Sequence, residues 1–190
     1  SVSVHPLAGQ RVRACDYPDL EQIKKAYNET IPCIDEPAQR VSFGTSGHRG
    51  KAMDGSFTAL HVGAVVQAIC NLRQSFGAAG PVFVGADTHY LSQLAYQTTL
   101  NVLAYNQIAA CTDCEGDFVP TPSVSRAVLR YNENRSEKRG DGIIITPSHN
   151  PPDCGGIKYK GRRKRSKPLV GNRVYLAGSG NTAGGKSHSL

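Results

Sequence analysis

The chain has 190 residues, a length that suits one sizeable domain. Hydrophobic residues make up 39% of it and charged residues 19%, a globular composition that excludes the fibrous and intrinsically disordered classes. No apolar run approaches the roughly 18 residues of a membrane span, and the N-terminal residues lack the apolar core of a secretory signal. We therefore expect a cytoplasmic protein that does not enter a membrane.

The net charge of +7 is concentrated in the last part of the chain. Residues 160–190 hold eight Lys and Arg residues and no Asp or Glu. The residues before them carry a net charge of about −1 and so compose an ordinary near-neutral domain. A basic segment can bind nucleic acid or direct nuclear import, but the charge of the domain itself gives no support to a nucleic-acid partner.

Periodicity along the chain predicts alternating helices and strands. Residues 1–40 predict an N-terminal leader with one helix, over residues 18–27. A short strand is expected at 41–43, a helix at 56–76 capped by Ser56, and a strand at 81–85. They are followed by expected elements at 91–106 (helix), 107–111 (strand), 122–131 (helix) and 142–146 (strand). This alternation predicts an α/β domain with a mostly parallel sheet whose faces are covered by helices.

Two familiar motifs lack the surroundings that their chemistry needs. Cys111 and Cys114 form a C-x-x-C pair, but no second pair completes a zinc site. Residues 180–187 match the P-loop pattern G-x-x-x-x-G-K-S, yet only three residues follow them, too few for the helix that faces the phosphate. We therefore expect reduced thiols and no nucleotide site.

Two loops at predicted strand ends carry chemistry-bearing side chains, and ligands gather at such ends in α/β sheets. Residues 44–50 offer glycines, two hydroxyls and the guanidinium of Arg49, groups that suit the oxygens of a phosphate. Residues 146–152 hold Ser148 beside His149, and prolines restrict the conformation of this loop. From spacing alone, two polar turns without a ligand remain the alternative.

Four segments in this region resemble motifs of the α-D-phosphohexomutase family, most of all in its bacterial phosphoglucomutases. They are residues 43–50 (FGTSGHRG), 84–89 (VGADTH), 120–125 (PTPSVS) and 141–159 (DGIIITPSHNPPDCGGIKY). Four motifs in this order, over about 120 residues, are far more specific than a single pattern. The resemblance implies that residues 41–159 form a three-layer α/β/α domain with a mostly parallel mixed sheet. It also implies the interconversion of glucose 1-phosphate and glucose 6-phosphate.

The resemblance implies roles for the matching residues. Ser148 corresponds to the phosphoserine that donates and recovers the phosphoryl group, and its phosphate is the expected metal ligand. Arg49 corresponds to an arginine that binds phosphate, and Lys158 to a lysine that moves a proton or stabilises charge. His149 and Asn150 correspond to residues that orient the serine loop. The implied cofactor is Mg²⁺, the substrate is a phosphosugar, and the intermediate is glucose 1,6-bisphosphate.

Other matching residues have expected roles around this centre. Thr45 and Ser46, together with Asn150, form the expected substrate- and phosphate-binding set. Thr45, Ser46 and Asp87 are expected to shape the loops or to join their hydrogen-bond networks. For Asp87 we favour a capping role at the helix that follows it.

The resemblance covers only the first of the family's four domains. The Asp-rich metal loop, the sugar-recognition loop and the distal phosphate loop of the family have no match in this sequence. We therefore expect the chain to be inactive by itself. The abrupt change of composition after Tyr159 favours an out-of-frame tail at residues 160–190 over a basic extension that binds nucleic acid. The alternative function is a non-catalytic interaction module that uses such an extension.

Overall fold

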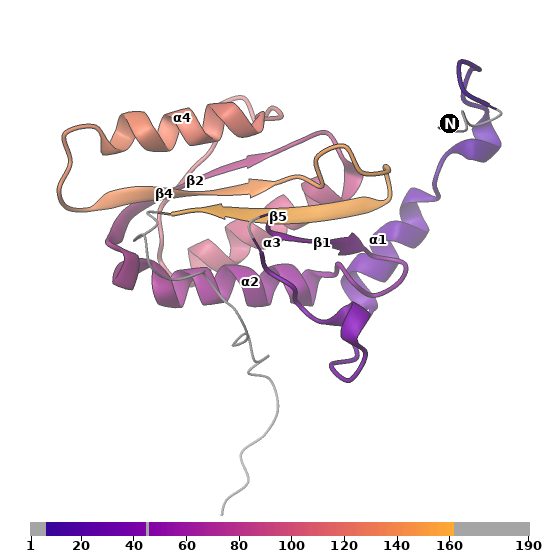
Figure 1. The fold of residues 1–190 in the computed structure, drawn as a ribbon, viewed down its shortest axis with the longest axis horizontal. Coiled ribbons are helices and arrows are strands. Elements are labelled where there is room, and N and C mark those ends of the chain that lie inside the picture. The colour runs from indigo at the N-terminus through magenta and orange to yellow at the C-terminus, as the bar shows by residue number, and fades with distance from the viewer. Residues whose placement is uncertain (1–6, 45, 162–190) are drawn as a thin grey trace, which may run out of the picture.

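The structure is a computed structural model that describes residues 7–44 and 46–161 (Figure 1). The helices in these residues are α1 (Leu20–Glu29), α2 (Ala59–Leu72), α3 (Tyr90–Tyr105) and α4 (Thr121–Asn132). The strands are β1 (His48–Lys51), β2 (Ala78–Ala86), β3 (Ala110–Cys111), β4 (Arg139–Ile145) and β5 (Cys154–Lys160). Short 3-10 helices lie at Ala14–Asp16, Pro37–Gln39 and Arg73–Phe76.

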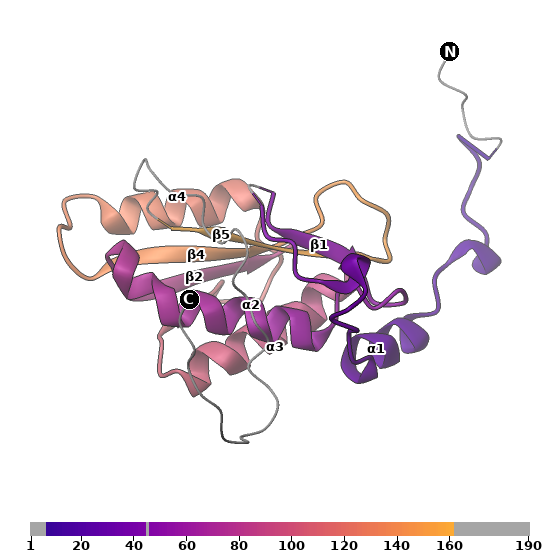
Figure 2. The ribbon, with the colours of Figure 1, turned by 60° about the horizontal axis from the view of Figure 1, so that its bottom comes forward.

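The strands form one five-stranded mixed sheet in the order β1-β5-β4-β2-β3. β2 pairs in parallel with β3 and with β4, whereas β5 pairs antiparallel with β4 and with β1. Figures 1 and 2 show α4 on one side of the sheet and α2 and α3 on the other. These layers confirm the predicted three-layer α/β/α domain.

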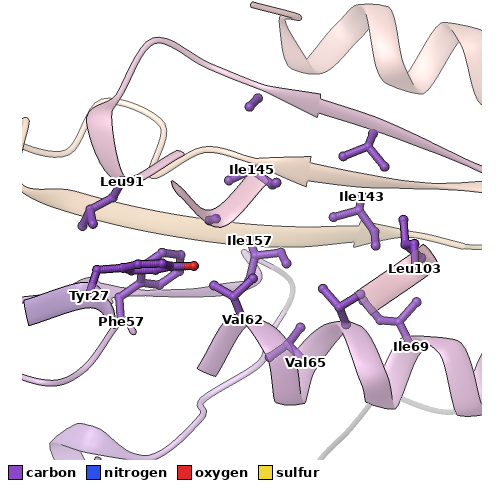
Figure 3. Close-up of a cluster of buried hydrophobic side chains, with 14 of the residues drawn as sticks. Tyr27, Phe57, Val62, Val65, Ile69, Leu91, Leu103, Ile143, Ile145 and Ile157 are labelled. Atoms are coloured by element: carbon purple, nitrogen blue, oxygen red, sulfur yellow. The ribbon is translucent and has the colours of Figure 1, made fainter. Parts of the chain in front are cut away.

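The main core lies between the sheet and the helices α2 and α3. Figure 3 shows the apolar side chains of α2 facing isoleucines of β4 and β5, namely Val62, Val65, Ile69, Ile143, Ile145 and Ile157. Burying each of these side chains stabilises the fold by about 1.5–3 kcal/mol. The expected helix of the N-terminal leader, α1, also joins this core through Ile23 and Tyr27, and the Tyr27 hydroxyl is 2.9 Å from Thr98 Oγ1.

The first strand of the sheet is not where periodicity predicts it. Residues 41–43 are not a strand, and the first strand is β1, which pairs with β5. The sequence pattern did not predict β5 as a strand either. Both strands are short or glycine-containing segments, whose strand propensity is low until a partner strand supplies the hydrogen bonds.

The predicted N-cap of α2 is also wrong. Thr58 is the N-cap residue, and its backbone N–H donates to Nδ1 of His61 at 3.2 Å. Ser56 lies in the turn before it, where its hydroxyl accepts from the backbone N–H of Lys51 at 2.9 Å. The helix ends at Leu72, and a 3-10 turn continues to the predicted end of the helix.

Several other expectations concern absences or the last residues. No helix within residues 7–44 and 46–161 is long and apolar enough to cross a membrane. All six cysteines are free thiols. The P-loop-like segment 180–187 and the basic residues from Arg162 onward lie outside the described residues, so the out-of-frame and nucleic-acid interpretations stay predictions.

Candidate phosphoryl-transfer site

The two loops singled out in the sequence, 44–50 and 146–152, lie against the same strand, β5. Gly47 has a φ of +79°, and a Cβ there would lie 2.1 Å from the carbonyl oxygen of Ile157. A Cβ on Gly156 would lie 2.4 Å from the carbonyl oxygen of Thr146. Glycine at these two positions therefore lets both loops approach β5 more closely than any other residue would.

Ser148 is an exposed residue that the serine loop, residues 146–152, holds in an uncommon conformation. Its φ is +70°, a left-handed value that costs a non-glycine residue roughly 1–2 kcal/mol. Its backbone N–H donates to the hydroxyl oxygen of Thr146 at 2.8 Å, and that hydroxyl donates to the carboxylate of Asp87. These contacts offset the strain and fix the backbone turn at Ser148.

Asp87 and His89 connect the serine loop to the end of β2. Asp87 accepts from the backbone N–H of His89 through Oδ1 at 3.0 Å, and its Oδ2 lies 3.0 Å from His89 Nδ1. The opposite ring nitrogen, Nε2, lies 3.1 Å from the carbonyl oxygen of Asn150. Burial by itself raises the pKa of Asp87, but the hydrogen bonds from Thr146 and His89 lower it below its usual value.

The predicted capping role of Asp87 is therefore wrong, although its network role is confirmed. The N-cap residue of α3 is His89, and its side chain makes no capping hydrogen bond. Asp87 instead accepts the hydroxyl of Thr146 and so supports the serine loop from the neighbouring strand. Asp87 therefore acts across the sheet as well as on the N-cap residue of α3.

Arg49 and Lys158 place two cations on the same face of the sheet. Arg49 pairs with Gly156 on β5, and Lys158 lies two residues further along that strand, on the face opposite Ile157. Nε of Arg49 is buried and has no hydrogen-bond partner among the described residues. Burial lowers the pKa of Lys158, and the charges of Arg49 and Lys160 lower it further.

Arg49 and Lys158 together lack an anion that would neutralise them. A phosphoryl oxygen would satisfy the unpartnered Nε of Arg49 and offset the repulsion between Arg49 and Lys158. The guanidinium and the ammonium differ in kind, because the first offers a planar fork and the second a point charge that can release a proton. Together with an exposed serine hydroxyl, these groups suit transfer of a phosphoryl group.

The remaining expected site residues are placed as follows. Ser46 and His149 are exposed, and Asn150 is half-buried and turns its backbone carbonyl toward His89. Thr45 lies outside the described residues. Sequence reasoning assigned no role to Thr146 or His89, although both stand inside the quoted motifs; the positions of their partners in the folded chain reveal their roles.

The described residues do not by themselves form a metal site. No group of three or more His, Cys, Asp or Glu side chains within residues 7–44 and 46–161 could hold a metal ion. The carboxylate of Asp87, in the network beneath the serine loop, is already engaged by Thr146 and His89. Cys111 and Cys114 likewise have no third ligand in this part of the chain.

Comparison with known proteins identifies this arrangement. Residues 40–166 match the family described as "Phosphoglucomutase/phosphomannomutase, alpha/beta/alpha domain I". The chain is 42% identical over 157 residues to a phosphoglucomutase of Komagataeibacter xylinus, an overlap that covers 83% of this chain and 28% of that protein. It is 32% identical over 138 residues to a phosphoglucosamine mutase of Synechococcus sp. (strain WH7803), with 69% of this chain and 25% of the relative covered.

A third relative is a phosphoglucomutase of Staphylococcus epidermidis, 34% identical over 123 residues that cover 64% of this chain and 21% of that protein. The chain thus spans about a quarter of the length of these relatives. The matched residues contain the whole sheet, the serine loop and both cations of the site. With this fold and these matches, the chain belongs to the phosphoglucomutase/phosphomannomutase family and contains its alpha/beta/alpha domain I.

Proposed function

We propose that this chain is the phosphoryl-carrying domain of a phosphoglucomutase and that Ser148 accepts and returns the phosphoryl group. The reaction is the interconversion of glucose 1-phosphate and glucose 6-phosphate through glucose 1,6-bisphosphate. The observation that carries the proposal is an exposed serine, held in a strained turn by its own loop, beside the paired strands β1 and β5, whose cations Arg49 and Lys158 lie on one face of the sheet. A serine that only turned the chain would need neither the strain nor the cations.

The reaction proceeds by two transfers of opposite direction. In the first, a sugar hydroxyl attacks the phosphorus of phosphorylated Ser148, so that the bond to Oγ breaks and a sugar bisphosphate forms. In the second, Ser148 Oγ takes the phosphoryl group from the other position of the bisphosphate, which restores the phosphoserine. Atoms balance over the cycle, and the sugar phosphate leaves as its isomer.

The cations have separate tasks in these transfers. The guanidinium of Arg49 binds oxygens of the transferred phosphoryl group through donors that include its unpartnered Nε. Lys158, whose pKa is lowered by burial and by nearby positive charge, is suited to move the proton of the attacking hydroxyl or to stabilise charge. His149, Asn150, Thr45 and Ser46 complete the proposed loop and phosphate contacts.

The Mg²⁺ of the proposal would neutralise charge on the transferred phosphoryl group. The described residues do not supply a group of three side-chain ligands for it, so the oxygens of phosphorylated Ser148 would be the contribution of this domain. What the chain itself provides is the nucleophile, its orientation and the two cations.

The proposal is tested by the phosphorylation of Ser148. The chain is incubated with glucose 1,6-bisphosphate, and the phosphate is mapped by mass spectrometry. We expect one equivalent on Ser148 and none in Ser148→Ala, whereas Ser136→Ala, which replaces an exposed serine outside both loops, should leave the phosphorylation of Ser148 unchanged. Phosphate that appears elsewhere and persists in Ser148→Ala would overturn the assignment.

The identity of the sugar needs its own comparison, because phosphoglucosamine mutases are among the relatives. We favour glucose phosphates, since the phosphoglucomutase of K. xylinus shares 42% identity over 83% of this chain. The same labelling experiment with glucosamine 1,6-bisphosphate should give slower phosphorylation. Faster labelling by the amino sugar would reverse the choice.

Location and domain limits belong to the same proposal. We propose a cytoplasmic protein, which agrees with six free thiols. We also propose that residues 1–40 precede the family domain, that the domain proper is residues 41–159, and that residues 160–190 are an out-of-frame tail. The family match itself extends to residue 166, so reading the encoding DNA around the codon of Lys160 is the direct test.

A further inference from the structure

We propose that His89 is a positioning residue that, as an imidazolium, fixes the serine loop by donating a hydrogen bond from each ring nitrogen. This inference rests on the proposed role of Ser148 as phosphoryl carrier. His89 is the N-cap residue of α3, whereas the groups it holds follow β2 and β4. His89 stands inside the quoted motif at residues 84–89, but the sequence alone assigned it no role.

The contacts of the His89 ring determine its protonation state. Nδ1 lies 3.0 Å from Oδ2 of Asp87, and Nε2 lies 3.1 Å from the carbonyl oxygen of Asn150. Both partners only accept hydrogen bonds. A neutral imidazole carries one N–H and would leave one contact as an unfavourable pairing of acceptors, whereas the imidazolium satisfies both.

Both ends of this bridge lead to Ser148. On one side, Asp87 accepts the hydroxyl of Thr146, whose oxygen accepts the backbone N–H of Ser148 at 2.8 Å. On the other side, Asn150 lies two residues after Ser148 in the same loop. His89 therefore supports the left-handed turn at Ser148 through Thr146, which precedes it, and through Asn150, which follows it. His89 itself does not contact the phosphoryl group.

The charges around His89 are consistent with its protonated form. Asp87 is the ionised partner, and the side chains of His89 and Asp87 are only 18% and 25% exposed. Lys158 on β5 also interacts with the charge of Asp87, while Arg49 on β1 acts on Lys158. From the serine loop, Asn150 offers a neutral carbonyl, and His149 is exposed.

The experiment compares His89→Ala, which removes both donors, with His89→Arg, which keeps several donors and a charge that does not titrate. Lys51→Gln is the matched control. It removes the 2.8 Å ion pair between Lys51 and Asp153, which lies just before β5 and outside the site. All are made in the full chain. Three quantities are measured: the exchange rate of the Ser148 amide proton, the rate of Ser148 phosphorylation by glucose 1,6-bisphosphate, and the protonation of the His89 ring by ¹⁵N NMR.

We expect both nitrogens of the wild-type ring to carry protons at pH 6. His89→Ala should raise the amide exchange rate and lower the phosphorylation rate, each by roughly tenfold, the usual effect of losing a buried hydrogen bond. His89→Arg should restore both. Lys51→Gln should behave as the wild type.

A singly protonated ring at pH 6, or unchanged exchange and phosphorylation in His89→Ala, would overturn the inference. Should His89→Ala fail to fold, the ring protonation of the wild type decides instead. Failure of the proposed function looks different, because the wild type would then not be phosphorylated at all. The ring protonation and the amide exchange would still test the positioning role.

Discussion

Acid should destabilise this domain by charging two buried histidines next to the site. The rings of His48 and His61 stack with centroids 5.1 Å apart, and each residue is only 2% exposed. His48 Nδ1 accepts the backbone N–H of Ser42 at 3.3 Å, and His61 Nδ1 accepts that of Thr58 at 3.2 Å. Both rings are therefore neutral in the folded protein, and protonation would remove these acceptors and place two like charges together.

The magnitude follows from the shift of His48. Burial, with a contribution from the charge of His61, lowers the pKa of His48 from 6.5 to about 4. A histidine with a lowered folded pKa binds fewer protons folded than unfolded, so its contribution to stability is complete above pH 6.5 and is lost as the pH falls toward 4. At pH 4.5 the loss is about 2.5 kcal/mol, a large share of the roughly 5–15 kcal/mol that stabilises a typical domain. Burial also lowers the pKa of His61, which acts in the same direction.

The assay is urea unfolding at pH 7.5 and pH 4.5, followed by circular dichroism. The comparison is between the wild type and His48→Gln, whose amide oxygen can still accept the Ser42 N–H but does not titrate. The wild type should lose about 2.5 kcal/mol more unfolding free energy between the two pH values than His48→Gln does. His149→Gln, which replaces an exposed histidine of the serine loop, is the control and should lose as much as the wild type.

Equal losses in the wild type and His48→Gln would refute this reasoning, because other groups would then account for the acid sensitivity. Carboxylates that titrate near pH 4 contribute to all three proteins alike, and the difference between variants removes their effect. A larger loss in His48→Gln than in the wild type would contradict even the sign.

Three further predictions concern the fold and the reaction. Asp141→Asn should lower the unfolding free energy by about 3–5 kcal/mol in urea at pH 7, because Asp141 is 0% exposed and pairs with Arg73; a loss below about 1 kcal/mol would contradict this. Gly156→Ala should accelerate exchange of the Ser148 amide and cost about 1–3 kcal/mol, because its Cβ would lie 2.4 Å from the Thr146 carbonyl oxygen; an unchanged exchange rate would count against it. The chain alone, given glucose 1-phosphate, Mg²⁺ and glucose 1,6-bisphosphate, should show no catalytic turnover to glucose 6-phosphate in a coupled assay beyond the one equivalent of sugar monophosphate released when Ser148 is phosphorylated, because the described residues hold no three-ligand metal group; multiple turnover that Ser148→Ala abolishes would refute this.

Much of the scaffold was predictable from the sequence. The helices α2, α3 and α4 and the strands β2 and β4 were expected close to their observed positions, because their apolar residues repeat at helical spacing or form a continuous buried run. The prolines around Ser148 and the glycines before Arg49 likewise marked the two loops that the fold brings to β5. For these elements the local sequence was sufficient, because each pattern lies within a few residues of the helix, strand or loop that it predicts.

The N-cap of α2 shows where local signals were ambiguous. Ser56 and Thr58 are both good capping residues, and sequence alone gives no reason to prefer the second. The turn after β1 decides between them, because the hydroxyl of Ser56 is used by the backbone N–H of Lys51. Thr58 is then left to cap the helix, with His61 as its partner.

Only the tertiary structure decided the strand character of β5 and the support of the serine. β5 begins with two glycines after Cys154 and has no clear alternation, yet it becomes a strand because β4 and β1 pair with it on either side. The contact between His89 and Asn150 joins residues that are 61 positions apart, and no spacing rule relates them. Periodicity reflects which residues of a segment are buried. A hydrogen-bond partner on another strand is determined only when the sheet brings the ends of the two strands together.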